Sequence, residues 1–121
     1  MRALRVVGVA MASLVGLMVT GGVAQAGGDA AKGKAAFQQY CGGCHGPTGK
    51  GDGPMGAAMN PKLKDLSDKG FTGSLKDDYL TKLIKEGGQA LGKSPMMPKM
   101  GGALKDNEVE DVIAFMRSLA K

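Results

Sequence analysis

The chain is poor in the residues that usually build a large hydrophobic core. Aromatic residues make up 4% of its 121 residues, tryptophan is absent, and there are only two cysteines and one histidine. A site built on several histidines is therefore excluded, and at most one intrachain disulfide is possible. This length predicts one domain rather than a large enzyme or a polytopic membrane protein. A domain this small often needs a staple or a bound group to complete its core.

The first 26 residues have the pattern of a secretory signal. Arg2 and Arg5 give a basic start, residues 6–19 are apolar, and the Ala-Gln-Ala sequence at 24–26 places small residues where a signal peptidase acts. We therefore expect cleavage after residue 26. An uncleaved membrane anchor is the alternative, because residues 6–24 form an uncharged stretch of 19 residues.

Residues 27–121 then form the mature domain, and its charge is mildly basic. The whole chain has a formal net charge of +5, and the signal segment holds two basic and no acidic residues, which leaves +3. The lysines are scattered without interleaved aromatic residues, so nucleic-acid binding is not expected. An acidic protein partner is the expected docking target, and a merely solvated surface is the alternative. No other apolar run can span a bilayer, so stable membrane insertion after cleavage is not expected.

Three helices are predicted, and no useful alternating strand pattern occurs, so the expected fold class is all-α. The first helix covers residues 29–40, with Asp29 as its N-cap. Residues of one face recur at helical spacing, namely Ala30, Gly33, Phe37 and Tyr40. Because Gly33 has no side chain, another helix can cross close to it.

The second and third helices are predicted at residues 75–86 and 107–120. Ser74 is the expected N-cap of the second, which ends at a Gly-Gly pair, and Asp106 is the expected N-cap of the third. The third helix carries an apolar stripe of Val109, Val112, Ile113, Met116 and Leu119, with Phe115 at its edge. Residues 42–73 and 89–105 are predicted loops, and the first is long enough to be functional.

The sequence Cys41-Gly42-Gly43-Cys44-His45 is the most specific signal in the chain. The spacing C-x-x-C-H is typical of c-type haem attachment, in which two thiols form thioethers with one porphyrin and the next residue supplies an axial imidazole. Both cysteines and the only histidine of the chain are used by this one motif.

Three other interpretations of the motif are weaker. A thioredoxin-like redox pair expects a βαβ context, which the sequence does not predict. A zinc site would lack a fourth Cys or His ligand. A disulfide between Cys41 and Cys44 would close a very short loop and stabilise the fold little.

The candidates for the second axial ligand of such a haem can be reduced by elimination. There is no second histidine, so methionine, lysine, tyrosine or an open site remains. The mature chain has six methionines: Met55, Met59, Met96, Met97, Met100 and Met116. Met116 lies on an apolar helix face and is expected in the core, whereas Met55 and Met59 could fill gaps around the porphyrin. The loop that holds Met96, Met97 and Met100 is stiffened by two prolines and could reach the opposite haem face.

Over nearly all of residues 29–121 the chain resembles a class I c-type cytochrome of the small bacterial periplasmic kind. Cys41, Cys44 and His45 match the haem-attachment motif. Residues 49–54 resemble the glycine-rich loop that follows it, and residues 97–104 resemble the segment that carries the distal ligand, with methionine in place of the usual aromatic at position 100. A crossing of the first and last helices is implied at Gly33, Phe37 and Phe115.

The resemblance implies a small cytochrome c fold around one covalent haem c. It implies Met97 as the distal ligand, with Met96 as its main rival and Met100 as the third choice. It also implies that the Pro54 carbonyl accepts a hydrogen bond from His45 Nδ1–H, a contact that orients the ring.

The expected function is that of a periplasmic one-electron carrier with His/Met ligation, not of an enzyme. Its redox partners would be an oxidase, a reductase complex or a dehydrogenase, docked near Lys50, Lys93 and Lys99. The alternative is an open-site haem protein, such as a gas sensor or a peroxidase. It would need a distal acid or base, and the mature chain has no second histidine and no arginine before Arg117.

Overall fold

The computed structural model describes residues 27–121, and the predicted signal segment lies outside this range. The described residues are helical and contain no strand, which confirms the all-α class. In chain order the elements are α1 (Ala30–Tyr40), α2 (Gly42–His45), η1 (Gly56–Ala58), α3 (Lys69–Gly73), α4 (Asp77–Glu86), η2 (Gln89–Leu91) and α5 (Asp106–Leu119). None of these helices is long and apolar enough to cross a membrane.

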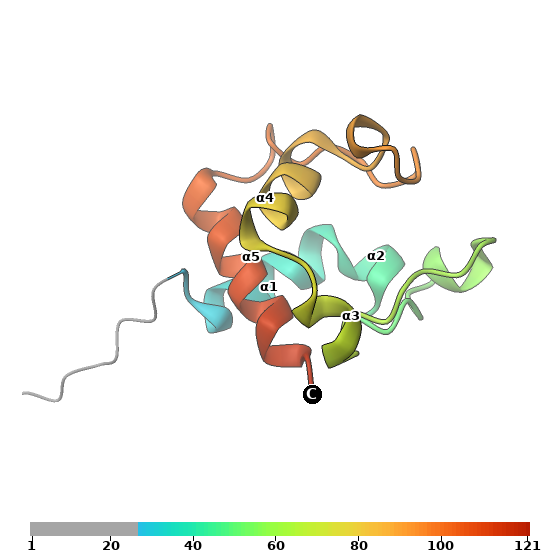
Figure 1. The fold of residues 1–121 in the computed structure, drawn as a ribbon, viewed down its shortest axis with the longest axis horizontal. Helices are drawn as coiled ribbons and strands as arrows, with labels where there is room; N and C mark the ends of the chain where they lie inside the picture. Colours follow the sequence, from blue (N-terminus) through green and yellow to red (C-terminus); the bar gives the residue numbers. More distant parts are fainter. Residues whose placement is uncertain (1–26) are drawn as a thin grey trace, which may run out of the picture.

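The predicted crossing of the first and last helices is confirmed, and α1 and α5 lie across one another in Figure 1. A Cβ atom added to Gly33 would overlap the backbone carbonyl of Asp111 in α5. Next to this contact, the rings of Phe37 and Phe115 pack with their centroids 5.2 Å apart. The absence of a side chain at Gly33 therefore sets how closely the two helices approach.

Capping residues hold the start of α1 in place. The Asp29 carboxylate accepts hydrogen bonds from the N–H groups of Ala31 (2.9 Å) and Lys32 (3.2 Å), as the N-cap prediction requires. Its own N–H donates to the Asp111 carboxylate at 2.7 Å. The N-terminus of α1 is thus tied to α5 as well as capped.

The core lies between these helices and α4. Its buried hydrophobic residues are Phe37, Leu66, Leu80, Ile84, Leu104, Val109, Val112, Ile113, Phe115 and Met116. The predicted stripe of the last helix is buried except for Leu119, which packs at the margin of the core. Phe115 is fully in the core rather than at the edge of the stripe, and Met116 is the core residue that was expected.

The N-cap prediction for the second helix is wrong. The helix α4 begins at Asp77, and Ser74 instead ends the unpredicted helix α3, with its Oγ donating to the Phe71 carbonyl at 2.6 Å. The carboxylate of Asp68 caps α3 by accepting from the Phe71 N–H at 3.2 Å. The predicted loop of residues 42–73 thus contains α2, η1 and α3, which are too short to produce a periodic hydrophobic pattern.

The N-cap prediction for the last helix is also wrong. Asp106 is the first residue of α5, and Lys105 occupies the N-cap position in extended backbone. The Glu108 carboxylate accepts from the Lys105 N–H at 3.1 Å, so a side chain of α5 itself satisfies this N–H group at the start of the helix. The Asp106 carboxylate pairs instead with Lys85 Nζ of α4 at 2.7 Å.

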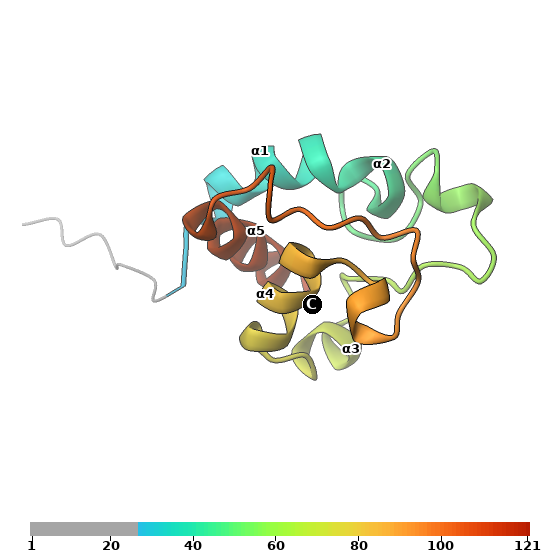
Figure 2. The same ribbon diagram turned by 90° about the horizontal axis from the view of Figure 1, so that it is seen from above.

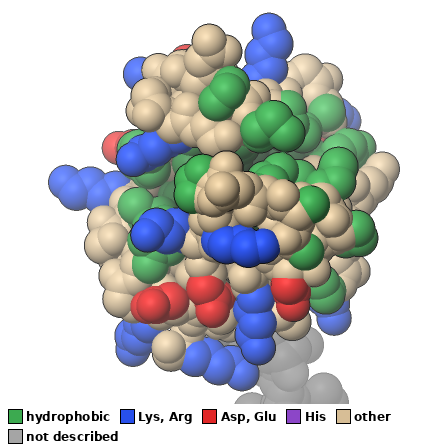
Figure 3. Space-filling model, turned by 90° about the vertical axis from the view of Figure 1, so that its right-hand side faces the viewer, with side chains coloured by type: hydrophobic (Ala, Val, Ile, Leu, Met, Phe, Trp, Pro, Cys, Tyr) green, Lys and Arg blue, Asp and Glu red, His purple; other side chains and the backbone are tan. Residues whose placement is uncertain are grey.

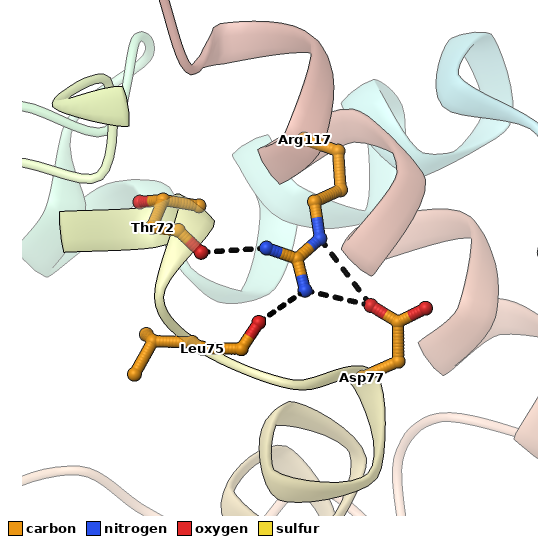
Figure 4. Close-up of polar contacts among 4 residues, drawn as sticks. All are labelled: Thr72, Leu75, Asp77 and Arg117. Carbon is orange, nitrogen blue, oxygen red and sulfur yellow. Dashed lines mark hydrogen bonds and ion pairs between the residues drawn. The ribbon is translucent and has the colours of Figure 1, made fainter. Parts of the chain in front are cut away.

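Arg117 ties the end of α5 to the segment that joins α3 and α4 (Figure 4). Its guanidinium donates to the carbonyls of Thr72, at 2.6 Å, and Leu75, and it pairs with the Asp77 carboxylate at 2.8 Å. These contacts hold three elements together on the side of the molecule away from η2. Arg117 is the only arginine in residues 27–121, and these contacts engage its guanidinium group.

Candidate haem site

The Cys41–His45 motif forms a single helical turn directly after α1. Cys41 ends α1 and begins α2, and its carbonyl accepts from the N–H of His45 at 2.9 Å and of Cys44 at 3.3 Å. Because one turn takes about 3.6 residues, side chains three positions apart lie on the same side of the helix. Both thiols are free and half-buried. The turn therefore presents the two cysteines together, as double thioether formation requires.

The glycine-rich segment that follows folds back over this turn. The N–H of Gly51 donates to the His45 carbonyl at 2.8 Å, and the N–H of Met55 donates to the Gly43 carbonyl at 2.9 Å. A Cβ atom at Gly56 would overlap the carbonyl of Cys44, so a side chain there would push the segment away. This close approach gives a physical reason for glycine in the loop after the motif.

The imidazole of His45 is held in the form that can ligate a metal. Burial lowers the pKa of His45, so the ring is neutral at neutral pH. Its ring centroid lies 6.2 Å from that of Phe37, a core residue of α1. The side chain therefore lies at the margin of the core with an uncharged ring.

The implied hydrogen bond from His45 Nδ1 to the Pro54 carbonyl is not formed. Nδ1 is buried and has no hydrogen-bond partner among the described residues. The residues that flank Pro54 are bonded to the main chain of α2, with Gly53 N–H on the Cys44 carbonyl (3.3 Å) and Met55 N–H on the Gly43 carbonyl. Pro54 itself is exposed, and its segment is hydrogen-bonded to the backbone of the motif rather than to the imidazole.

Cys41 lacks the lowered thiol pKa of a redox-active cysteine. Burial, with a smaller contribution from neighbouring Cys44, raises the pKa of the Cys41 thiol to about 11. A reactive thiol of the thioredoxin kind needs a lowered pKa, so Cys41 does not fit that role. No group of three or more His, Cys, Asp or Glu side chains in residues 27–121 could hold a metal ion, which argues against the zinc interpretation.

The methionines of the predicted ligand loop differ in exposure. Met96 is 65% exposed, whereas Met97 and Met100 are half-buried and pack against the core. Met55 is 60% exposed, and its Cε lies 2.9 Å from the point where a Cβ on Gly43 would be. Among the three candidates in the loop, exposure therefore favours Met97 or Met100 over Met96.

Main-chain hydrogen bonds hold Met97 on both sides. Its carbonyl accepts from the N–H of Gly88 at 3.0 Å, and its own N–H donates to the Ser94 carbonyl at 3.3 Å. Three residues later, the N–H of Met100 donates to the Ile84 carbonyl of α4 at 2.8 Å. The end of α4 therefore fixes the path of this loop, a feature that the spacing of methionines and prolines did not reveal.

The motif and the methionine loop lie at the same end of the molecule. In Figures 1 and 2, α2 and the segment after it share this end with η2 and the segment that leads to α5. Figure 3 shows the end face, on which hydrophobic side chains gather in a band, with lysine or arginine side chains around it. The donors present are two free thiols, one neutral imidazole and thioether sulfurs, and this set fits a c-type haem.

Comparisons with known proteins agree with this site. The family model described as Cytochrome c matches residues 30–120. Four chains of solved structure match, among them one described as KustC0563 c-type cytochrome, with a TM-score of 0.60 and 22% identity over 74% of this chain and 98% of that one. A search of curated proteins found no match. The chain therefore belongs to the cytochrome c family and is a class I c-type cytochrome, in a family of haem-based electron carriers.

Proposed function

We propose that the protein is a periplasmic one-electron carrier in which Cys41 and Cys44 hold one haem c covalently and His45 and Met97 are the axial ligands. The observation that carries the proposal is the single turn of α2, which presents two free thiols followed by a half-buried, neutral imidazole. No other pair of cysteines and no other histidine exists in the chain.

Each protein group has a separate role in this proposal. Bound haem c supplies an iron that accepts and releases one electron. His45 would provide the proximal nitrogen, and Met97 a thioether that raises the reduction potential relative to a second histidine. If His45 and Met97 both ligate the iron, these two residues would leave no ligand position for a substrate. We therefore propose electron transfer rather than catalysis.

The open-site alternative finds no support among the described side chains. A distal acid or base is needed to activate a ligand on such a haem. Arg117, the only arginine in residues 27–121, is already bonded to Thr72, Leu75 and Asp77. No second histidine exists to take the role.

Docking would be electrostatic and directed at an acidic redox partner, such as an oxidase, a reductase complex or a dehydrogenase. Lys50, Lys93 and Lys99 are exposed and lie in the two loops at the end of the molecule that carries the motif. The net charge of +3 expected after signal cleavage agrees with such a partner. The predicted signal segment supports export to the periplasm.

Two measurements on the native protein test this function. Denaturing electrophoresis should leave haem on the polypeptide, and a colourless band would contradict covalent attachment at Cys41 and Cys44. The oxidised protein should show the weak absorption band of a methionine–iron bond near the red end of the visible spectrum. The reduced protein should not bind carbon monoxide, and rapid binding would favour the open-site alternative.

A further inference from the structure

The two glycines that end α4, Gly87 and Gly88, contact the predicted ligand loop directly. Gly87 has φ 83° and ψ 169°, a backbone conformation that is open almost only to glycine. A Cβ atom on it would lie 2.9 Å from Lys99 N and 3.1 Å from the Met97 carbonyl oxygen. The backbone of residues 97–99 therefore rests on Gly87 with no space between them for a side chain.

Gly88 needs to be glycine for a different reason. Its φ of −65° and ψ of −40° are ordinary helical values that any residue can adopt. A Cβ atom on Gly88, however, would overlap the carbonyl oxygen of Ser94 and lie 3.2 Å from Met97 Cβ. The neighbour in the way is backbone, which cannot rotate aside as a flexible side chain could. The constraint on Gly88 is therefore one of space.

The polar groups of Gly88 are also fully used by the loop. Its N–H donates to the Met97 carbonyl at 3.0 Å, and its carbonyl accepts from the N–H groups of Lys93 (2.8 Å) and Leu91 (3.1 Å). Gly88 is buried, so each of these bonds would be costly to lose. One residue thus fixes the loop before Met97 and the main chain of Met97 itself.

We propose that Gly88, supported by Gly87, is a positioning element for the distal ligand: it sets where the Met97 sulfur lies and so controls how firmly that sulfur binds. This inference rests on the proposed role of Met97 as ligand. A displacement of the loop that carries Met97 would move the sulfur and so weaken its bond. The hydrogen bond from Met100 N–H to the Ile84 carbonyl holds only the part of the loop that follows Met97.

The test compares Gly88→Ala with Gly102→Ala in the haem-loaded protein. Both variants add one methyl group to the same inter-helix segment, but a Cβ atom on Gly102 would meet nothing within 4 Å and needs no unusual φ. In Gly88→Ala we expect the methionine–iron absorption band to weaken and carbon monoxide to gain access to the reduced protein. The ratio of protein with Met97 bound to the iron to protein with Met97 released should fall about tenfold, a change within the free-energy cost expected for overpacking. Gly102→Ala should leave both readouts unchanged.

The outcomes separate the two proposals. If Met97→Ala keeps the band, Met97 is not the ligand, and the positioning role fails with the proposed ligation. If Met97→Ala loses the band while Gly88→Ala behaves like Gly102→Ala, the ligation stands and the positioning role is wrong.

A second measurement avoids dependence on the folding of Gly88→Ala. Energetic coupling between two sites is reciprocal. If the contacts of Gly88 strengthen the bond from Met97 to the iron, loss of that bond should weaken the contacts of Gly88 by the same free energy. Amide hydrogen exchange should therefore show faster exchange of the Gly88 N–H in Met97→Ala than in the native protein. The N–H of Val112, inside α5, serves as the internal reference and should not change. Unchanged protection of Gly88 would overturn the proposal.

Discussion

At the scale of single residues, the proposed ligation depends on which of two adjacent methionines would bind the iron. Met96 and Met97 are neighbours in sequence, yet Met96 is 65% exposed and Met97 packs against the core. The Gly88 N–H holds the main chain of Met97, whereas the Met96 N–H is bonded only to the Ser94 hydroxyl at 3.2 Å. Exposure and anchoring therefore both favour Met97.

Replacement of the two methionines should give opposite results. Met97→Ala should abolish the methionine–iron band, lower the reduction potential and open the iron to carbon monoxide, because the thioether is removed. The fold should survive, since the α1–α5 crossing does not involve this loop. Visible spectra and a redox titration measure these effects.

Met96→Ala is the matched control and should keep both the band and the potential. If Met96→Ala loses the band and Met97→Ala keeps it, the ligand is Met96. If neither variant changes the spectrum, the distal ligand does not come from these two residues.

At the scale of elements, the contact between α1 and α5 depends on one missing side chain. Gly33 lies against the Asp111 carbonyl, and this main-chain contact cannot adapt to a Cβ atom unless the helices separate. Separation would also loosen the packing of Phe37 on Phe115. The element that carries the haem motif at its end is therefore positioned by this crossing.

Substitution of helical glycines by alanine should affect stability differently at two positions. Gly33→Ala should lower the free energy of unfolding by about 1–3 kcal/mol, the usual cost of overpacking, despite the better helix propensity of alanine. Gly73→Ala, in α3, adds a methyl group where nothing lies within 4 Å and should be neutral or stabilising by up to about 1 kcal/mol. Denaturant unfolding of both haem-loaded variants measures the difference, and equal effects would argue against the close crossing.

At the scale of the whole molecule, the cofactor is expected to contribute to folding. The buried core of the described residues contains only two aromatic side chains, Phe37 and Phe115. His45 Nδ1 is buried without a partner, and both thiols are half-buried and unbonded. Such a site is costly for the polypeptide to maintain alone.

The haem-free chain should consequently be largely disordered. Protein with Cys41→Ala and Cys44→Ala, produced without haem attachment, should show little helical circular dichroism, because its small core cannot offset the chain entropy. The haem-loaded native protein, measured alongside, should unfold cooperatively. A cooperative thermal transition in the haem-free chain would show that the core is sufficient by itself.

Electron transfer should depend on ionic strength if docking is electrostatic. With a net charge of +3 and exposed lysines near the motif, the rate with an acidic partner should fall as salt is raised, since screening shortens the range of attraction. Stopped-flow measurements over a series of salt concentrations test this. A flat profile with the native partner would indicate mainly apolar docking.

Local features of this protein could be predicted from its sequence. The haem motif, the Asp29 cap of α1 and the apolar stripe of α5 each depend on residues within a few positions of one another. Their physical causes are short-range, because a helical turn and a cap are set by neighbouring dihedral angles and hydrogen bonds. The extent of α1 and α5 followed from the same patterns.

Contacts between distant segments were decided only by the tertiary structure. The helix α3 contains two glycines, so its own sequence favours a helix only weakly. It forms because Thr72 is buried and held at both polar groups: its hydroxyl donates to the Leu66 carbonyl at 2.7 Å, and its carbonyl accepts from Arg117. Ser74 and Asp106 are residue types that favour N-cap positions, but they make other contacts. Ser74 donates to the Phe71 carbonyl, and Asp106 pairs with Lys85. The Met97 carbonyl accepts from the Gly88 N–H, and the Met100 N–H donates to the Ile84 carbonyl. These partners meet only when the loop folds back on the end of α4. Sequence spacing identifies the groups that can bind haem, whereas packing decides which of them are held in place.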